Sequence, residues 1–170
     1  IMTKDVNSGA FLTIDLTALK QNYQTLDEKL FSAKLAAVVK ANAYGLGIKE
    51  IATTLSSLGC SKFFVASLEE GIELRNILPN AKIYILHGVL SETARDLTNN
   101  SLIPVLNSLE QIESWQPHAN HTAALHIDTG MSRLGLTPKE CNKSQVLGLN
   151  NIDLVMSHLA CAEDKNHPKN

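Results

Sequence analysis

The stretch Ala36–Gly47, AAVVKANAYGLG, holds residue types whose spacing could support chemistry. Its first four residues are small or β-branched and predict a buried strand that runs directly into Lys40. A partly desolvated lysine amine can lose its proton and attack an aldehyde, whereas a guanidinium stays protonated. Tyr44 can donate its hydroxyl to an anion, and the two glycines after it let backbone N–H groups approach the same ligand. The stretch therefore combines an imine-forming amine with an anion cradle.

Such a combination suggests pyridoxal phosphate as the cofactor. Spacing alone leaves open a simpler interpretation, in which Lys40 is a solvated loop residue after a strand. The residue order V-K-A-N-A-Y-G-x-G over 39–47 resembles the pyridoxal-phosphate attachment motif of bacterial alanine racemases. The V-K-A-N core by itself is similar to a wider group that includes ornithine- and diaminopimelate-type decarboxylases. Tyr44 and Gly45 narrow the resemblance to the racemases.

A second stretch of this kind, LHIDTGMSRLG, spans residues 125–135. Gly130 permits a tight turn that can aim Arg133 back across the end of the preceding strand, where a planar cation can hold an anionic oxygen. From the residues alone, a surface arginine paired with some carboxylate is the alternative. The pattern D-T-G-M-x-R-x-G over 128–135 also resembles the second alanine racemase motif. In that family the arginine lies against the phenolic oxygen of the cofactor, which implies the same role for Arg133.

His126 departs from the family pattern. Many members have a lysine here that carries a carbamate and orients the arginine, and histidine cannot do that chemistry. Strand alternation places His126 and Asp128 on one face. We therefore expect Arg133 to be held by His126, by water or by a bound anion such as chloride. A packed core histidine is the alternative interpretation of His126.

The segment Ser157–Ala160, SHLA, is similar to the family segment whose histidine packs against the cofactor ring. A histidine at a strand end is more often structural, but the series of motifs favours a cofactor contact for His158. His87 also follows a strand and has no motif to support it. The resemblance thus implies a catalytic Lys40, cofactor binding by Lys40, Tyr44, Arg133 and His158, and no metal site.

The elements that position these residues alternate strand and helix along the chain. An additional strand is predicted at 10–14, and helix start signals occur at 137–140. Helices are predicted over 16–30, 48–58, 67–76, 91–97 and 108–115. Six core strands are predicted over 36–39, 63–66, 82–86, 102–106, 123–127 and 152–156.

This alternation predicts an α/β fold of the TIM-type (β/α) barrel class. Lys40, Asp128 and His158 each follow a predicted strand, and active sites of such barrels lie at that end. A closed barrel has eight strands and typically about 250 residues. With about six core strands and a loop-like stretch over 163–170, the chain is expected to be a truncated barrel.

Composition restricts the function classes further. The chain has 170 residues, of which 44% are hydrophobic and 19% charged, and a net charge of −2, which disfavours nucleic acid and membrane surfaces as partners. Cys60, Cys141 and Cys161 are odd in number and widely spaced, which favours reduced thiols in a cytoplasmic protein. The polar opening Met2–Asp5 does not look like a signal peptide. A small neutral or zwitterionic substrate fits these properties.

The resemblance extends from Ile14 to about Asp164 and implies a pyridoxal-phosphate isomerase that interconverts L- and D-alanine for cell-wall peptidoglycan. It also implies a homodimer in which the barrel precedes a β domain. Residues 1–170 are then the N-terminal part of the barrel, without its last strands and without the β domain. The second catalytic base, a tyrosine of the partner's β domain, would lie outside the chain, so the isolated chain is expected to be inactive or weakly active and to self-associate.

Two alternatives remain from the sequence. One is another enzyme of the same barrel group, such as a racemase for other amino acids or a decarboxylase. The other is a non-catalytic pyridoxal-phosphate-binding protein, for which a naturally single-domain chain would be typical. The substrate-selecting residues lie mostly beyond residue 170, so the sequence does not separate the racemases by substrate.

Overall fold

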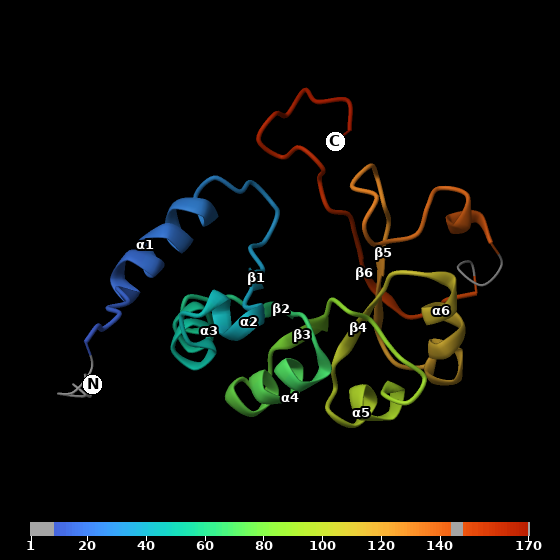
Figure 1. Cartoon of the computed structure of the whole chain (residues 1–170), viewed down its shortest axis with the longest axis horizontal. Helices are drawn as coiled ribbons and strands as arrows, with labels where there is room; N and C mark the ends of the chain where they lie inside the picture. Colours follow the sequence, from blue (N-terminus) through green and yellow to red (C-terminus); the bar gives the residue numbers. More distant parts are fainter. Residues whose placement is uncertain (1–8, 144–147, 170) are drawn as a thin grey trace.

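Six parallel strands form one sheet in which every strand lies beside its neighbours in sequence (Figure 1). The computed structural model describes residues 9–143 and 148–169, so the opening at Met2–Asp5 lies outside the described part. The strand order confirms the prediction of repeated βα units and of six core strands. The strands are β1 Ala37–Val38, β2 Lys62–Val65, β3 Lys82–Ile85, β4 Ile103–Leu106, β5 Ala123–His126 and β6 Ile152–Met156.

Helices connect the strands. The helices are α1 Leu16–Asp27, α2 Lys40–Tyr44, α3 Ile48–Ser57, α4 Leu68–Ile77, α5 Ala94–Asn99 and α6 Leu109–Trp115, with short 3₁₀ helices η1 Gln116–His118 and η2 Glu140–Asn142. Three of them, α1, α4 and α6, begin at a residue whose side chain accepts a backbone hydrogen bond. Asp15 accepts hydrogen bonds from the backbone N–H groups of Thr17 and Ala18, and Ser108 accepts one from Gln111. No helix among the described residues is long and apolar enough to cross a membrane.

The central strands are buried on both faces, which explains their continuous apolar sequence. Phe63, Ile83 and their same-face neighbours belong to the larger core beneath the helices. The alternate residues form a smaller cluster on the inner face of the sheet, where the rings of Phe64 and Tyr84 stack with centroids 4.6 Å apart. Two apolar layers thus fix the sheet and present the carboxyl ends of its strands together.

A polar link joins β6 to β3 across the inner face. The register between β5 and β6 shifts at Ala123/Ala124, and Asp153 follows on β6. Its carboxylate accepts a hydrogen bond from Lys82 Nζ at 2.5 Å and another from the Tyr84 hydroxyl. The fully buried Tyr84 thereby satisfies its polar atom, and burial together with Asp153 raises the pKa of the phenol.

Several predicted boundaries are wrong. No strand forms at 10–14, and Phe11 is 86% exposed, because no neighbouring strand in the described part of the chain pairs with this segment. Helix α1 ends at Asp27 and has no fully buried residue. Helix α5 begins at Ala94 after a turn.

In the part of the chain that the structure describes, the predicted helix start at Thr137 leads to a 3₁₀ turn. The Thr137 N–H and hydroxyl both donate to Glu140, and the Glu140 N–H donates back to the Thr137 hydroxyl, so the predicted cap itself forms. The turn ends at Asn142, and residues 144–147 lie outside the described part. Correct start chemistry therefore did not determine how far the helix extends.

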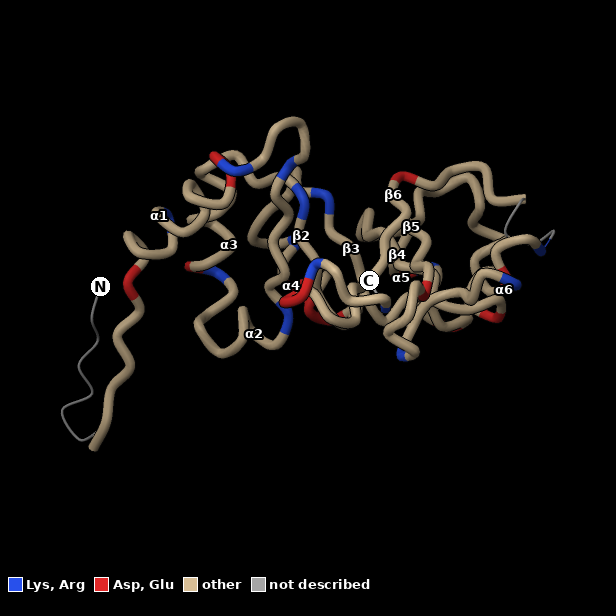
Figure 2. Tube along the Cα trace, turned by 90° about the horizontal axis from the view of Figure 1, so that it is seen from above, with Lys and Arg blue, Asp and Glu red and all other residues tan. Residues whose placement is uncertain are grey.

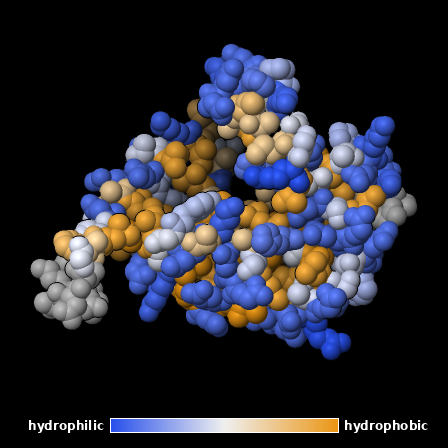
Figure 3. Space-filling model, viewed as in Figure 1, coloured by the Kyte–Doolittle hydropathy of each residue, from blue (hydrophilic) through white to orange (hydrophobic). Residues whose placement is uncertain are grey.

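Charged residues of both signs are spread over the chain, in agreement with its small net charge of −2. Lys and Arg residues are interspersed with Asp and Glu residues along the chain (Figure 2). Viewed as in Figure 1, the molecule is hollowed below its C-terminal segment, and hydrophobic residues border the hollow (Figure 3).

Candidate active site

A pocket at the carboxyl ends of the strands contains all four residues predicted to bind a cofactor. Its volume is about 430 Å³. It brings together residues from both motifs and from the strand ends of β3 and β6, whereas Asp128, which also follows a strand, is not part of the lining. The lining residues are Val38, Lys40, Tyr44, Phe64, Ala66, Leu86, His87, His126, Arg133, Leu134, Met156 and His158. His87, which no motif supported, lies in this lining.

The turn that carries Lys40 is left-handed. Lys40 begins α2, and the next four residues, 41–44, have φ between 51° and 56°. Each L-residue in this conformation costs about 1–2 kcal/mol, so consecutive ones persist only when their surroundings hold them. Gly45 ends the turn at φ 83°, where glycine is favoured. The glycine at position 45 is a sequence signal for a positive φ, but nothing in the sequence indicated that residues 41–44 are also left-handed.

Glu70 of α4 holds this turn from outside. Its Oε1 accepts a hydrogen bond from the Ala41 N–H and its Oε2 accepts one from the Ala66 N–H, both at 2.7 Å. The carboxylate therefore ties the Lys40 turn to the end of β2. Ser67 and Glu70 have the S-x-x-E spacing of a capping box, and only half of that box forms, since Ser67 accepts from the Glu70 N–H at 3.5 Å. No local sequence signal could have revealed the bond to Ala41.

A second tie fixes the far end of the turn. Asn42 Oδ1 accepts the Ile48 N–H at 2.8 Å and so caps α3, whose N-cap residue Gly47 has no side chain to do this. The N–H groups of Gly45 and Gly47 bond back to Ala41 and Asn42 carbonyls. Lys40 consequently lies at the start of a turn that is bonded at both ends.

The loop that carries Arg133 is organised around its own first residue. Asp128 accepts hydrogen bonds from the Gly130 and Ser132 N–H groups at 3.0 Å, and these bonds lower the pKa of its carboxyl. Gly135 has φ 107°, and a Cβ there would lie 2.8 Å from the Asp128 nitrogen, so the loop requires glycine at this position. Arg133 is exposed, and its guanidinium makes no hydrogen bond or ion pair with the described residues.

Two histidines from adjacent strands lie beside this loop. His126 at the end of β5 is buried, with Nδ1 2.8 Å from Asn107 Oδ1. Burial lowers the pKa of its ring, and so do the nearby His158 and Arg133, while Asp128 opposes them. His158 is exposed on the segment after β6, which a 2.5 Å hydrogen bond between Thr129 and Ser157 joins to the Arg133 loop.

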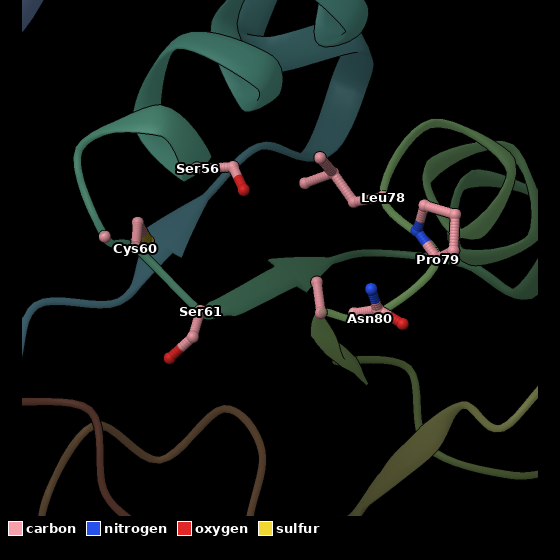
Figure 4. A pocket seen from close by; sticks show the side chains of 8 residues that line it. Ser56, Cys60, Ser61, Leu78, Pro79 and Asn80 are labelled. Carbon is pink, nitrogen blue, oxygen red and sulfur yellow. The ribbon is translucent and has the colours of Figure 1, made fainter.

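A different pocket lies at the amino-terminal ends of β2 and β3 (Figure 4). It has a volume of about 380 Å³ and is lined by Ser56, Gly59, Cys60, Ser61, Leu78, Pro79, Asn80 and Ala81. Burial raises the pKa of the Cys60 thiol, which donates to the Lys62 carbonyl. This pocket contains no charged side chain, whereas the pocket with Lys40 contains two.

Comparison with known families identifies what these features belong to. Residues 14–170 match the family described as alanine racemase, N-terminal domain. The chain belongs to this family. The prediction drawn from the two motifs is thereby confirmed.

Relatives extend the match over nearly the entire chain. It is 41% identical to an alanine racemase of Rhizobium meliloti over 97% of the chain and 46% of that protein. It is 46% identical to a catabolic alanine racemase of Agrobacterium fabrum over 96% of the chain and 45% of that protein. The chain therefore spans about half the length of the relatives it matches.

Solved structures agree with the fold. The crystal structure of alanine racemase from Bartonella henselae, with covalently bound pyridoxal phosphate, matches with a TM-score of 0.83 and 39% identity over 91% of this chain and 48% of that one. Alanine racemase from E. faecalis matches with a TM-score of 0.79 and 32% identity over 90% of this chain and 44% of that one. The TIM-type arrangement of the strands is thus confirmed.

Proposed function

We propose that residues 1–170 are the N-terminal part of a pyridoxal-phosphate-dependent alanine racemase. The observation that carries this proposal is the pocket in which Lys40, Tyr44, Arg133 and His158 meet at the carboxyl ends of the strands. The alanine racemase relatives support it, as does the Bartonella henselae enzyme with its covalently bound cofactor. In the complete protein the remaining barrel strands and a β domain would follow this chain.

The residues of the pocket fit that cofactor. One amine lies at a fixed turn, and one guanidinium is left without a partner among the described residues. A volume of about 430 Å³ is also of the size expected for a small-molecule site. Pyridoxal phosphate would supply the electron sink that makes an amino-acid α-proton removable.

Each residue has a role that its chemistry allows. Lys40 Nζ would hold the cofactor covalently, and its free amine would take or return the α-proton on one face of the substrate carbon. Tyr44 would donate its hydroxyl to the phosphate, and Arg133 would donate to the phenolic oxygen. His158 would contact the cofactor ring. The turn bonded by Glu70 would fix the position of the lysine amine.

Inversion requires a second acid or base on the opposite face. We expect that group to come from the β domain of a partner subunit in a homodimer, so the isolated chain should turn over weakly or not at all. Val38 on β1 and Val155 on β6 are 46% and 61% exposed at the sheet edges, which favours self-association of the isolated chain. The complete enzyme would act in the cytoplasm and supply D-alanine for peptidoglycan.

A proton-exchange experiment tests this proposal. The chain with pyridoxal phosphate is incubated in heavy water with either L- or D-alanine, and deuterium at the α-carbon is followed by NMR. One base predicts exchange into one enantiomer without formation of the other. Rapid racemisation would contradict the proposal that the second acid or base comes from a partner subunit. If a chain that binds the cofactor exchanged the α-proton of neither enantiomer, the role of Lys40 would be contradicted. Other amino acids assayed in the same way define the substrate class.

A further inference from the structure

His126 is bonded to Asn107 in a way that determines which ring nitrogen carries the proton. The Asn107 amide nitrogen donates to the Leu86 carbonyl at 2.9 Å and to the Val105 carbonyl at 2.8 Å. With the amide reversed, its oxygen would face two carbonyl oxygens, so the orientation is fixed. Asn107 Oδ1 must therefore accept from His126, and the proton lies on His126 Nδ1.

The other ring nitrogen is left as an acceptor. His126 Nε2 has no hydrogen-bond partner among the described residues, and it is not one of their fully buried unpartnered atoms, so it opens to the pocket. Burial lowers the pKa of the ring, which keeps it neutral at physiological pH. The groups that face it are His158, Asp128 and Arg133.

Arg133 needs such an acceptor. The Asp128 carboxylate is already engaged by the Gly130 and Ser132 N–H groups within the loop. Arg133 itself is exposed and makes no hydrogen bond or ion pair with the described residues. A neutral nitrogen lone pair can orient a guanidinium without neutralising its charge.

We propose that His126, held in the Nδ1–H form by Asn107, is the positioning residue for Arg133, and that the exposed guanidinium donates to His126 Nε2 when it turns into the pocket that both residues line. The ligand that Arg133 would bind rests on the proposed function, whereas the hydrogen bonds that fix the His126 ring do not. Arg133 then keeps its full positive charge for an anionic ligand oxygen in the pocket. A charged partner for Arg133 would reduce that charge.

Nitrogen-15 NMR of the histidine rings in the cofactor-free chain tests the proton assignment. The expected result is a protonated Nδ1 and an unprotonated Nε2 for His126 from about pH 7 to about pH 8. The Asn107→Leu variant removes the acceptor of the Nδ1 proton, so the fraction of His126 rings protonated at Nε2 should rise. A wild-type ring protonated at Nε2 would overturn the proposal. The matched control is His121→Gln, which replaces a histidine in an exposed loop and should leave the His126 ring resonances unchanged.

The link to Arg133 has its own measurements. In the cofactor-free chain, Arg133→Gln should move the His126 Nε2 resonance, and Arg95→Gln on the exposed face of α5 should leave it in place. Equal responses to the two variants would overturn the proposal. With pyridoxal phosphate added, His126→Phe and Arg133→Gln should be coupled by about tenfold in affinity. Additive effects of the two substitutions on affinity would also overturn the proposal. Failure of the wild-type chain to bind pyridoxal phosphate would instead contradict the proposed function. The two NMR measurements on the cofactor-free chain would then still decide the proposal.

Discussion

The two loops that carry the candidate chemistry are held in opposite ways. The Lys40 turn is left-handed and is bonded from outside by Glu70, whereas the Arg133 loop folds around its own Asp128. In the first loop, hydrogen bonds to the backbone fix the position of Lys40. In the second loop, the Arg133 guanidinium makes no hydrogen bond or ion pair with the described residues. A residue that forms a covalent bond needs one position, and a residue that binds an anion can close on its ligand. The following changes separate these two modes of support.

The largest effect is expected from Lys40→Arg. A guanidinium cannot attack the aldehyde, so covalent retention of pyridoxal phosphate through dialysis should disappear. Lys49→Arg on the exposed face of α3 is the matched control and should retain the cofactor. Retention by the Lys40 variant would place the covalent site on another lysine.

The next largest effect is expected from Glu70→Gln. A carboxamide has one acceptor oxygen and cannot accept both the Ala41 and Ala66 N–H groups. We expect the free energy of unfolding to fall by about 1–3 kcal/mol, together with slower reaction of Lys40 with the cofactor. Chemical denaturation and the rate of spectral change measure the two quantities. Glu69→Gln is the adjacent exposed control, and an equal effect of both variants would show that charge alone is responsible.

A smaller effect, confined to the other loop, is expected from Asp128→Asn. The affinity for pyridoxal phosphate should fall by about tenfold as Arg133 loses its backbone support, while the rate of attack by Lys40 stays unchanged. Because the pKa of Asp128 is lowered in the folded chain, its carboxylate stabilises the fold above the ordinary pKa of about 3.9. That contribution is lost as the pH falls through the lower folded pKa. Unfolding of both chains at neutral and acid pH should converge on acidification; a constant difference would contradict this.

The smallest effect distinguishes strain from ordinary helix propensity. Ala41→Gly relieves a φ of 51° and should raise the free energy of unfolding by up to about 1 kcal/mol. Ala18→Gly on the exposed face of the right-handed α1 should lower it by about 1 kcal/mol. Thermal unfolding of the two variants gives opposite signs if the left-handed turn is strained. A loss in both variants would show that the turn carries no strain.

Periodic and local features of the sequence were sufficient for the fold. Strands such as β2 and β3 follow from apolar runs buried on both faces, and the motif around Lys40 placed that residue correctly at the end of β1. The segment at 10–14 was wrongly predicted as a strand because its apolar composition says nothing about whether a partner strand exists.

The supporting contacts of the site could not be predicted in the same way. Glu70 bonds to Ala41 across 29 positions of sequence, and Asn107 meets His126 across 19. Such bonds depend on how neighbouring βα units pack, which no local pattern encodes. His87 lines the pocket because it follows β3. A position after a strand does not by itself distinguish a pocket-lining residue from a solvated one.

Borohydride trapping tests the central claim most directly. The chain is incubated with pyridoxal phosphate, reduced, digested and mapped by mass spectrometry. The account predicts a pyridoxyl group on Lys40 far in excess of that on Lys49 or Lys62, because among the lysines that the structure describes only Lys40 combines a fixed turn with the pocket that contains Arg133. An unmodified Lys40 in a chain that circular dichroism shows to be folded would contradict the claim that these residues form a working cofactor site.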